Sequence, residues 1–525
     1  MRTIKNIIAV LACFAFFQPA VGKDWHNVMD YGAKNDSTGK NTEVIKKAIE
    51  TASSEGGGTV YFPAGKYITG AIHLKSNITL HLEAGAELHF SDDFDDYLPM
   101  VESRWEGTEV VNFSPFIYAN GVENVTIEGR GLLDGHGKKW WGFSEVTIRN
   151  QKDDSEDTKW QKEFKRLNKD VLAPDLPGWV EKGFLRPPFI QFLNSKNIQI
   201  KDIKIVNSPF WTINPQYCDN VNIDGVTIEN PPSPNTDGVN PESCRNVRIA
   251  NCYISVGDDC ITIKSGKDRS GRKVNIPAEN YTITNCVMLR GHGGVVIGSE
   301  MSGGVKNIVI SNSVFDGTDR GIRLKTARGR GGVVEDIRVS NIVMRNIRDQ
   351  AIVLDMQYAK TDPEPISERT PAFRNVFISG LTGSTKRLAR LRGLEELPIE
   401  NIVFADITME AETGFILENV NDIYIRDVHA KIKTGPAIEA KTVDFAKFTN
   451  VNNNTPDASS AVIKLENTSN INIQDSYPFK ETKSFLELKG TENENVFLMN
   501  NNFFHVDKLI EGPIDQVKQV NNLVK

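Results

Sequence analysis

A short phrase that recurs along the chain limits its fold more than any other sequence feature. Each copy opens with Asn or Asp and continues with residues in which apolar and polar side chains alternate. Most copies are separated by roughly 20 to 40 residues, which is the spacing of solenoid repeats. The copies begin at Asn124, Asn197, Asn220, Asn246, Asn280, Asn307, Asp336, Asn375, Asn401, Asp422 and Asn470.

The alternation within each copy indicates a β-strand with one buried face. The copies follow one another too closely for a strand plus a crossover helix, and few helical patterns intervene. A β-propeller is the main alternative, but its blades need about 40 to 50 residues each. We therefore predict an all-β fold, a single-stranded right-handed parallel β-helix. The Asn or Asp that opens each copy is predicted to lie in a turn, where a short polar side chain satisfies local backbone groups.

The first 22 residues predict an export signal. Arg2 and Lys5 supply a positive start, residues 7–17 an apolar core, and residues 20–22 a small-residue cleavage site. That core is too short to span a membrane, and no later stretch is apolar enough to do so. Cys13 offers the alternative of a lipid anchor, but the apolar run continues beyond it, which favours simple cleavage. The predicted location is periplasmic or extracellular.

The remaining residues, 23–525, are predicted to form one β-helix domain. Residues 41–52 carry an apolar helical face, and such a helix would cap the open end of a solenoid. The regular spacing of the phrase is interrupted at residues 91–188, which contain only one copy of it, so we expect a long insertion there. Its tryptophans are more often used to anchor loops than to stack on a ligand. Residues 434–525 are predicted to add less regular turns.

The net charge and the cysteine content limit which ligands and metals the protein is expected to bind. A net charge of -7 argues against a nucleic-acid binder, although a local cationic pocket could still bind an anionic ligand. An odd number of cysteines follows the predicted cleavage site, and no CxxC pair suggests zinc, so buried thiols are expected. These cysteines are Cys218, Cys244, Cys252, Cys260 and Cys286.

Four polar motifs fall at corresponding points of successive coils. They are Asn235-Thr236-Asp237-Gly238, Gly257-Asp258-Asp259-Cys260, Gly291-His292-Gly293 and Arg323-Leu324-Lys325. Aligning the strands that follow them places apolar residues in one inward column at Val239, Ile261, Val295 and Ile322. Because side chains alternate along a strand, Arg323 and Lys325 then point outward. Asp237 and Asp259 share the column just ahead of the inward one. Asp258 lies one residue earlier, and His292 lies in the same turn of the next coil.

Neighbouring strands lie about 4.8 Å apart, so the three aspartates are expected to crowd together. At least one carboxyl should keep its proton to higher pH than a free Asp, while nearby cations lower the pKa of others. A protonated acid beside ionised partners is suited to glycosidic bond cleavage. A single aspartate in a β-helix turn more often caps backbone amides. Four ordered motifs on one face favour a catalytic site.

The four motifs resemble the signatures of the polygalacturonases, family 28 of the glycoside hydrolases. Leu324 stands where the family usually has isoleucine. The resemblance extends from residues 30–33 to Gln357-Tyr358 and thins out toward the C-terminus. It implies inverting hydrolysis of α-1,4-linked galacturonan, an acidic plant cell-wall polysaccharide, without metal or cofactor.

The resemblance also implies catalytic roles. Asp258 would be the general acid, Asp237 and Asp259 would hold and deprotonate the attacking water, and His292 would tune the acid. Inverting enzymes usually separate acid and base by about 6.5–9.5 Å, and adjacent coils suggest less. Which of Asp237 and Asp259 is the base therefore stays open.

The same resemblance implies binding roles. Arg323 and Lys325 would grip galacturonate carboxylates, as chemistry also expects of paired cations. Tyr358 matches a family tyrosine on the leaving-group side, and Asn235 positions either its loop or the sugar.

Exo action is favoured over endo action, because residues 91–188 are long enough to close one end of a cleft. The alternatives are an endo-polygalacturonase and a hydrolase of branched pectin, such as rhamnogalacturonan or xylogalacturonan. Family members that cut rhamnogalacturonan tend to lack the full set of His292, Arg323 and Lys325. A calcium-dependent pectate lyase and a non-catalytic polysaccharide-binding β-helix are less favoured. The protein is expected to be a monomer.

Overall fold

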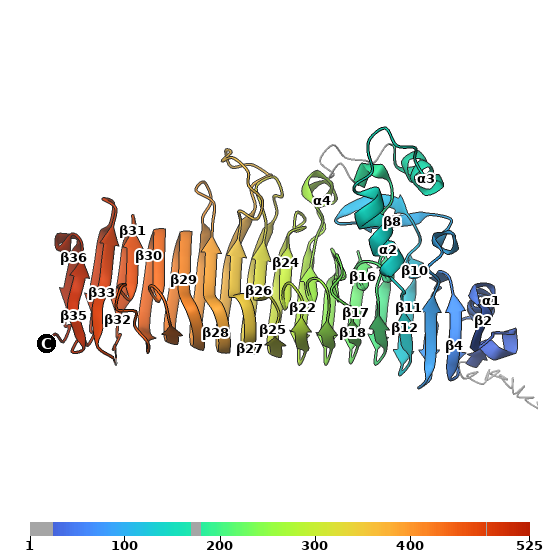
Figure 1. Ribbon diagram of the computed structural model, residues 1–525, viewed down its shortest axis with the longest axis horizontal. Helices are drawn as coiled ribbons and strands as arrows, with labels where there is room; N and C mark the ends of the chain where they lie inside the picture. Colours follow the sequence, from blue (N-terminus) through green and yellow to red (C-terminus); the bar gives the residue numbers. More distant parts are fainter. Residues whose placement is uncertain (1–24, 170–179, 479) are drawn as a thin grey trace, which may run out of the picture.

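The computed structural model describes residues 25–169, 180–478 and 480–525. They form one long coil of parallel strands, the predicted right-handed parallel β-helix (Figure 1). The predicted export signal, residues 1–22, lies outside the described residues. Within the described part of the chain, no helix has the length and apolar character needed to span a bilayer.

Each regular coil contributes strands to three parallel sheets that follow the axis. The first sheet contains β5 (Ile72–His73), β10 (Ile117–Asn120), β13 (Ile190–Leu193), β16 (Ile213–Gln216), β21 (Ile261–Ile263), β24 (Val295–Gly298) and β26 (Arg320–Lys325). Val239 links β16 to β21, because it pairs with both Ile213 and Ile261. The sheet is therefore continuous across the predicted motifs.

The second and third sheets complete the coil. The second contains β1 (Trp25–Asn27), β3 (Gly58–Phe62), β6 (Ile78–Leu82), β11 (Glu123–Gly129), β14 (Lys196–Lys201), β17 (Asp219–Asp224), β19 (Arg245–Ala250) and β22 (Ala278–Thr284). The third contains β2 (Asp36–Lys40), β4 (Gly65–Thr69), β7 (Ala86–Phe90), β12 (Leu132–Asp134), β15 (Lys204–Val206), β18 (Thr227–Glu229), β20 (Tyr253–Ser255) and β23 (Val287–Arg290).

Further along the chain the strands run on through the corners of the coil. The long elements are β25 (Val305–Asp316), β27 (Val333–Asp355), β28 (Ala372–Arg392), β29 (Ile399–Ile432) and β30 (Ile438–Asn453). The last coils contain β31 (Ile463–Glu466), β32 (Ser469–Gln474), β33 (Thr482–Lys489), β34 (Glu494–Met499), β35 (Val506–Glu511) and β36 (Val517–Val520). All of these strands keep the parallel pairing.

The alternating phrases fill the interior, as β17 illustrates. Val221 and Ile223 are fully buried, whereas the polar residues between and after them are half-buried. Both stack on apolar residues of β14 and β19, in the coils before and after. Burying one such side chain stabilises the fold by about 1.5–3 kcal/mol, so the repeated phrase supplies the core.

The residue that opens each phrase has a left-handed backbone, with φ near +58° at Asn124 and Asn220. Asn and Asp tolerate this conformation better than other non-glycine residues. The left-handed residue fits the predicted turn, but several of these side chains bond to the neighbouring coil, and some bond directly to their equivalent there. The Asn197 amide donates to Asn124 at 2.9 Å, and the Asn220 amide donates to Asn197 at 2.8 Å.

The turn between the second and third sheets is short in most coils, and residues 83–85 between β6 and β7 make it one residue longer. It spans two residues in the coils that turn at residues 130–131, 202–203, 225–226, 251–252 and 285–286. Cys252 and Cys286 occupy this turn in successive coils. All five cysteines of the described chain are buried free thiols, as the sequence predicted.

A helix, α1 (Thr42–Ser54), lies at the N-terminal end of the coil, where the sequence predicted one (Figure 1). Its apolar face buries Ile45, Ala48, Ile49 and Ala52. Its capping role stays a prediction. Short helical turns elsewhere are η1 (Val28–Tyr31), η2 (Phe94–Tyr97), η4 (Val180–Lys182) and η5 (Ile514–Gln516).

Of residues 91–188, the structure describes 91–169 and 180–188, and part of these rises from the coil beside α4 (Asp268–Val274) in Figure 1. They contain an antiparallel hairpin of β8 (Val101–Trp105) and β9 (Thr108–Asn112), then the coil strands β10 to β12, and then three helical segments. Those segments are α2 (Lys138–Trp141), the π-helix η3 (Gly142–Ile148) and α3 (Lys159–Asn168). Trp140 is buried in an aromatic cluster with Phe94, Phe113 and Phe184, so it anchors this segment.

Candidate active site

The register of the first sheet brings the four sequence motifs together. Ile261 pairs with Val239 and with Val295, and Val295 pairs with Ile322. All four are buried at 0 or 1% exposure, which is the inward column expected from the sequence. The polar residues ahead of this column therefore lie side by side on successive coils.

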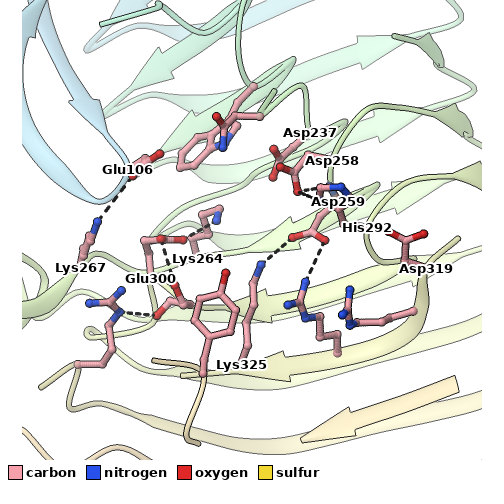
Figure 2. Close-up of a pocket in the computed structure, with 17 residues that line it drawn as sticks. Glu106, Asp237, Asp258, Asp259, Lys264, Lys267, His292, Glu300, Asp319 and Lys325 are labelled. Carbon is pink, nitrogen blue, oxygen red and sulfur yellow. Dashed lines mark hydrogen bonds and ion pairs between the residues drawn. The ribbon is translucent and has the colours of Figure 1, made fainter. Parts of the chain in front are cut away.

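One open cavity of about 510 Å³ collects every residue proposed from the sequence as catalytic or substrate-binding (Figure 2). These residues are Asn235, Asp237, Asp258, Asp259, His292, Arg323, Lys325 and Tyr358. The segment between β18 and β19 supplies Asp237, the loops ahead of β21 and β24 supply the other two aspartates and His292, and β26 supplies the two cations.

Three carboxyl groups form the centre of the cavity. One oxygen each of Asp237, Asp258 and Asp259 lies within 4.8 Å of the other two. The side chain of Asp259 is 1% exposed, whereas that of Asp258 is 19% exposed and so reaches furthest into the open cavity. Asp237 is also buried, and its Oδ2 accepts hydrogen bonds from Asn240 at 3.0 Å and Thr262 at 3.3 Å.

The carboxyl groups differ in how easily they ionise. Burial raises the pKa of Asp237 well above its usual range, and the negative charge of Asp258 adds to this effect. Burial also acts on Asp258, but the hydrogen bond from His292 and nearby positive charges outweigh it and lower its pKa. The raised pKa of Asp237 agrees with the expectation that one carboxyl keeps its proton to higher pH, although burial contributes more to it than crowding does.

His292 is bound to Asp258 in two ways. Its Nδ1 lies 3.1 Å from Asp258 Oδ1, and its backbone N–H donates to the Asp258 carbonyl at 2.9 Å. The side-chain hydrogen bond raises the pKa of His292. Figure 2 shows the imidazole beside the acidic cluster, at the edge of the cavity. His292 can therefore donate a hydrogen bond to the Asp258 carboxylate and stabilise its charge.

The two predicted cations of β26 lie next to the same carboxylate. Lys325 Nζ is 2.9 Å from Asp259 Oδ2, and Arg323 Nη1 is 3.8 Å from Asp259 Oδ1. Tyr358 lies over both cations, at 5.5 Å from the Arg323 guanidinium carbon and 5.6 Å from Lys325 Nζ. The phenol is 49% exposed, so it can contact a ligand in the cavity.

Asn235 has a left-handed backbone, and a buried arginine of the insertion fixes its side chain. Its Oδ1 accepts a hydrogen bond from Arg186 Nη2 at 2.8 Å. Arg186 is fully buried and also donates to the Pro234 carbonyl and to Glu145 Oε1, both at 2.6 Å. The insertion, residues 91–188, thus supports the loop that carries Asp237. Sequence reasoning missed Arg186, because no local pattern links it to Asn235.

Sequence reasoning also missed a second set of charges in the cavity. Lys264 Nζ forms a buried ion pair with Glu300 Oε2 at 2.5 Å, and Lys267 lies 3.6 Å from Glu106 (Figure 2). The alternation that placed Arg323 and Lys325 outward also places Thr262 on β21 and Lys264 just after it outward, so this signal was available. Trp211, another cavity residue, packs under the Lys264 amine at 4.6 Å.

The described residues contain two groups of side chains that could hold a metal ion. One is the acidic cluster of the cavity, where Lys325 and Arg323 already supply positive charge. The other is His89, Asp134 and His136, on the third sheet and outside the cavity.

Comparison with known proteins gives matches along most of the chain. Residues 180–431 match the family model for glycosyl hydrolases family 28, and residues 25–156 match a model described as rhamnogalacturonase A/epimerase, pectate lyase-like. A probable polygalacturonase of Vitis vinifera is 30% identical over 73% of this chain and 74% of its own length. An endo-polygalacturonase of Pectobacterium carotovorum subsp. carotovorum is 27% identical over 72% of this chain and 86% of its own length.

A solved structure shows the same fold. The hyperthermoactive exopolygalacturonase from Thermotoga maritima is 34% identical, with a TM-score of 0.66. The match covers 81% of this chain and 89% of that one.

Proposed function

Because the chain belongs to family 28 of the glycosyl hydrolases, we propose that it hydrolyses the α-1,4-galacturonosidic bonds of polygalacturonate. The observation that carries the proposal is the cavity in which three carboxyl groups within 4.8 Å of one another face Arg323 and Lys325. Carboxyl groups cleave glycosidic bonds by acid–base catalysis, and paired cations bind uronate carboxylates.

Asp258 is the proposed general acid, in agreement with the family resemblance. It is the most exposed of the three carboxyl groups and so can reach a glycosidic oxygen in the cavity. Its pKa is lowered in the free protein, chiefly by His292 against the effect of burial. Bound galacturonates bring negative charge beside it, which favours its protonated form.

Asp259 is the proposed base. Its Oδ2 lies 2.9 Å from Lys325 Nζ, whereas burial favours the neutral form of Asp237. Asp237 would then orient the attacking water. The carboxyl oxygens lie closer together than the usual 6.5–9.5 Å of inverting enzymes. Inversion therefore rests on the family resemblance, and the anomer that forms first tests it.

We further propose exo action and export. Glu106, in the turn of the β8–β9 hairpin, lines the cavity and faces Lys267 across 3.6 Å. The insertion thus supplies a wall at one side of the cavity, and a wall limits how far a chain can extend through it. The predicted signal in residues 1–22 supports a periplasmic or extracellular location.

The test is digestion of unesterified polygalacturonate in excess chelator, with products sized over time. We expect hydrolysis with monomer as the first product, since chelator spares a metal-free hydrolase and stops a calcium-dependent lyase. A series of oligomers at early times would refute exo action. Products with an unsaturated end would refute hydrolysis. Proton magnetic resonance of the first product reports its anomeric configuration, and retention would refute inversion.

A matched pair of variants separates catalysis from binding. Asp258→Asn should abolish nearly all turnover, while Asp224→Asn, an aspartate on the second sheet and away from the cavity, should keep it. Full turnover in Asp258→Asn would leave only a binding role for the cavity. Xylogalacturonan and rhamnogalacturonan as substrates test the branched-pectin alternative.

A further inference from the structure

A second cluster of chemically reactive side chains lies outside the cavity, on the outer surface of the third sheet. His89 is on β7, Asp134 ends β12, and His136 follows two residues later. Asp134 pairs directly with His89 across the two strands. The coil therefore brings together two imidazoles and one carboxylate from segments that are far apart in the sequence.

The distances within this cluster suit a shared ligand. His89 Nδ1 lies 3.0 Å from His136 Nε2, and Asp134 Oδ2 lies 3.9 Å and 3.8 Å from these two nitrogens. Two nitrogens bound to one zinc ion at about 2.0–2.1 Å are roughly 3.0–3.4 Å apart at tetrahedral or slightly smaller angles. A small rotation of the Asp134 side chain would bring its oxygen into the same shell.

In His89 and Asp134 the atoms that point away from the cluster already have hydrogen-bond partners, which leaves the converging atoms free to bind. His89 Nε2 lies 2.9 Å from Glu87 Oε2, so the ring proton belongs on Nε2 and the lone pair on Nδ1. Asp134 Oδ1 accepts hydrogen bonds from the His136 backbone at 3.1 Å and from Asn207 at 2.9 Å. Its Oδ2 therefore remains available. A carboxylate that fixes the tautomer of a ligating histidine is a common support of metal sites.

The surroundings allow an ion and a water ligand to enter. The side chains of His89, Asp134 and His136 are 21%, 14% and 46% exposed. His136 also borders a surface hollow that contains Asp92, Lys138 and Lys139. Lys139 lies 3.9 Å from Asp92, so its charge is partly balanced there.

We propose that His89, Asp134 and His136 bind a divalent transition-metal ion of the zinc type, with water completing the coordination. Nitrogen and carboxylate ligands in this number suit zinc, and imidazoles do not suit calcium or magnesium. Without the ion, one proton bridges His89 Nδ1 and His136 Nε2, and the ion replaces that proton. The bound ion would fasten β7 to β12, on either side of the β8–β9 hairpin.

The test is calorimetric titration of the full chain, without a histidine tag, with zinc chloride. We expect one ion per chain, and His136→Ala should abolish this binding. Glu87→Gln keeps all three ligands and removes only the supporting carboxylate, so it should weaken binding by about 10- to 100-fold. The melting temperature of the wild type should rise with zinc, and that of His136→Ala should not.

Two controls locate the ion. His505→Ala removes a surface histidine that pairs with Glu481 far along the coil, and it should bind zinc as the wild type does. Asp258→Asn alters the acidic cluster of the cavity and should also leave zinc binding unchanged. Absence of binding to the wild type would overturn the proposal. So would equal affinity in the wild type, His136→Ala and Glu87→Gln, or a loss of binding in Asp258→Asn.

Discussion

Replacing Arg186 by methionine should both destabilise the fold and disturb the loop that carries Asn235 and Asp237. The guanidinium is fully buried and donates to Glu145, to Asn235 and to two backbone carbonyls. It also lies 5.0 Å over the ring of Phe210. Methionine fills a similar volume but donates no hydrogen bond, so all four acceptors lose the bond from Arg186, and Glu145 keeps its pair with Arg149.

The size of the effect follows from these contacts. Removing one partner of a fully buried ion pair costs about 3–5 kcal/mol, and this is an upper value here because Glu145 is 17% exposed and keeps its pair with Arg149. A chain of about 500 residues has an unfolding entropy near 1 kcal/mol/K at its midpoint, so the melting temperature should fall by at most about 3–5 °C. The bond to Asn235 is charge-assisted, at about 1.5–3 kcal/mol, which corresponds to at most about a 10- to 150-fold loss in kcat/KM.

The assay compares Arg186→Met with Arg149→Met by thermal unfolding and by release of reducing ends from polygalacturonate. Arg149 pairs with the same Glu145 at 3.2 Å, but its side chain is 54% exposed. An exposed pair contributes about 0–1 kcal/mol, so this control should melt within about 1 °C of the wild type. Equal melting temperatures and equal kcat/KM in the two variants would refute the supporting role of Arg186.

Three further changes test the acidic cluster. Asp258→Asn should lower kcat by about 10²- to 10⁴-fold, since it removes the proposed general acid; a smaller loss argues against that role. His292→Gln should move the limb of the pH profile of kcat/KM that Asp258 sets toward higher pH, because the hydrogen bond that lowers the pKa of Asp258 is lost. An unmoved profile contradicts this. Asp237→Asn should raise the melting temperature at pH 7, because burial raises the pKa of Asp237 and the stability from its bound proton is lost as pH rises through that pKa. The gain should vanish below about pH 4, where the unfolded chain also binds this proton; an equal gain at both pH values would contradict the titration argument.

The fold was predictable because its determinants repeat. The alternating phrase identifies the inward residues, and the column of Val239, Ile261, Val295 and Ile322 follows from register alone. That register also carries the polar motifs into one cavity. The direction of a side chain on a regular strand can be predicted from the repeat alone, without the structure of distant loops.

The rest of the site depends on contacts between segments with no shared pattern. Arg186 reaches Asn235 from the insertion, and Glu106 enters the cavity from a hairpin that belongs to no coil. The sequence also did not reveal which of the aspartates keeps its proton. Crowding predicts one neutral carboxyl, but it is the contacts of Asp258 with His292 and nearby cations that lower its pKa, while burial leaves that of Asp237 raised.

The two-residue turn between the second and third sheets has an evolutionary consequence. This turn stacks on its equivalents above and below, and from β3 to β23 it varies only from two residues in most coils to three at residues 83–85. The connections on either side of the first sheet are not limited to two or three residues, and the hairpin, α4 and the helical segments all occur there. Residues can therefore be inserted or deleted beside the cavity while the β-helix itself is retained. The range of substrates that the cavity accepts can then change faster in evolution than the fold.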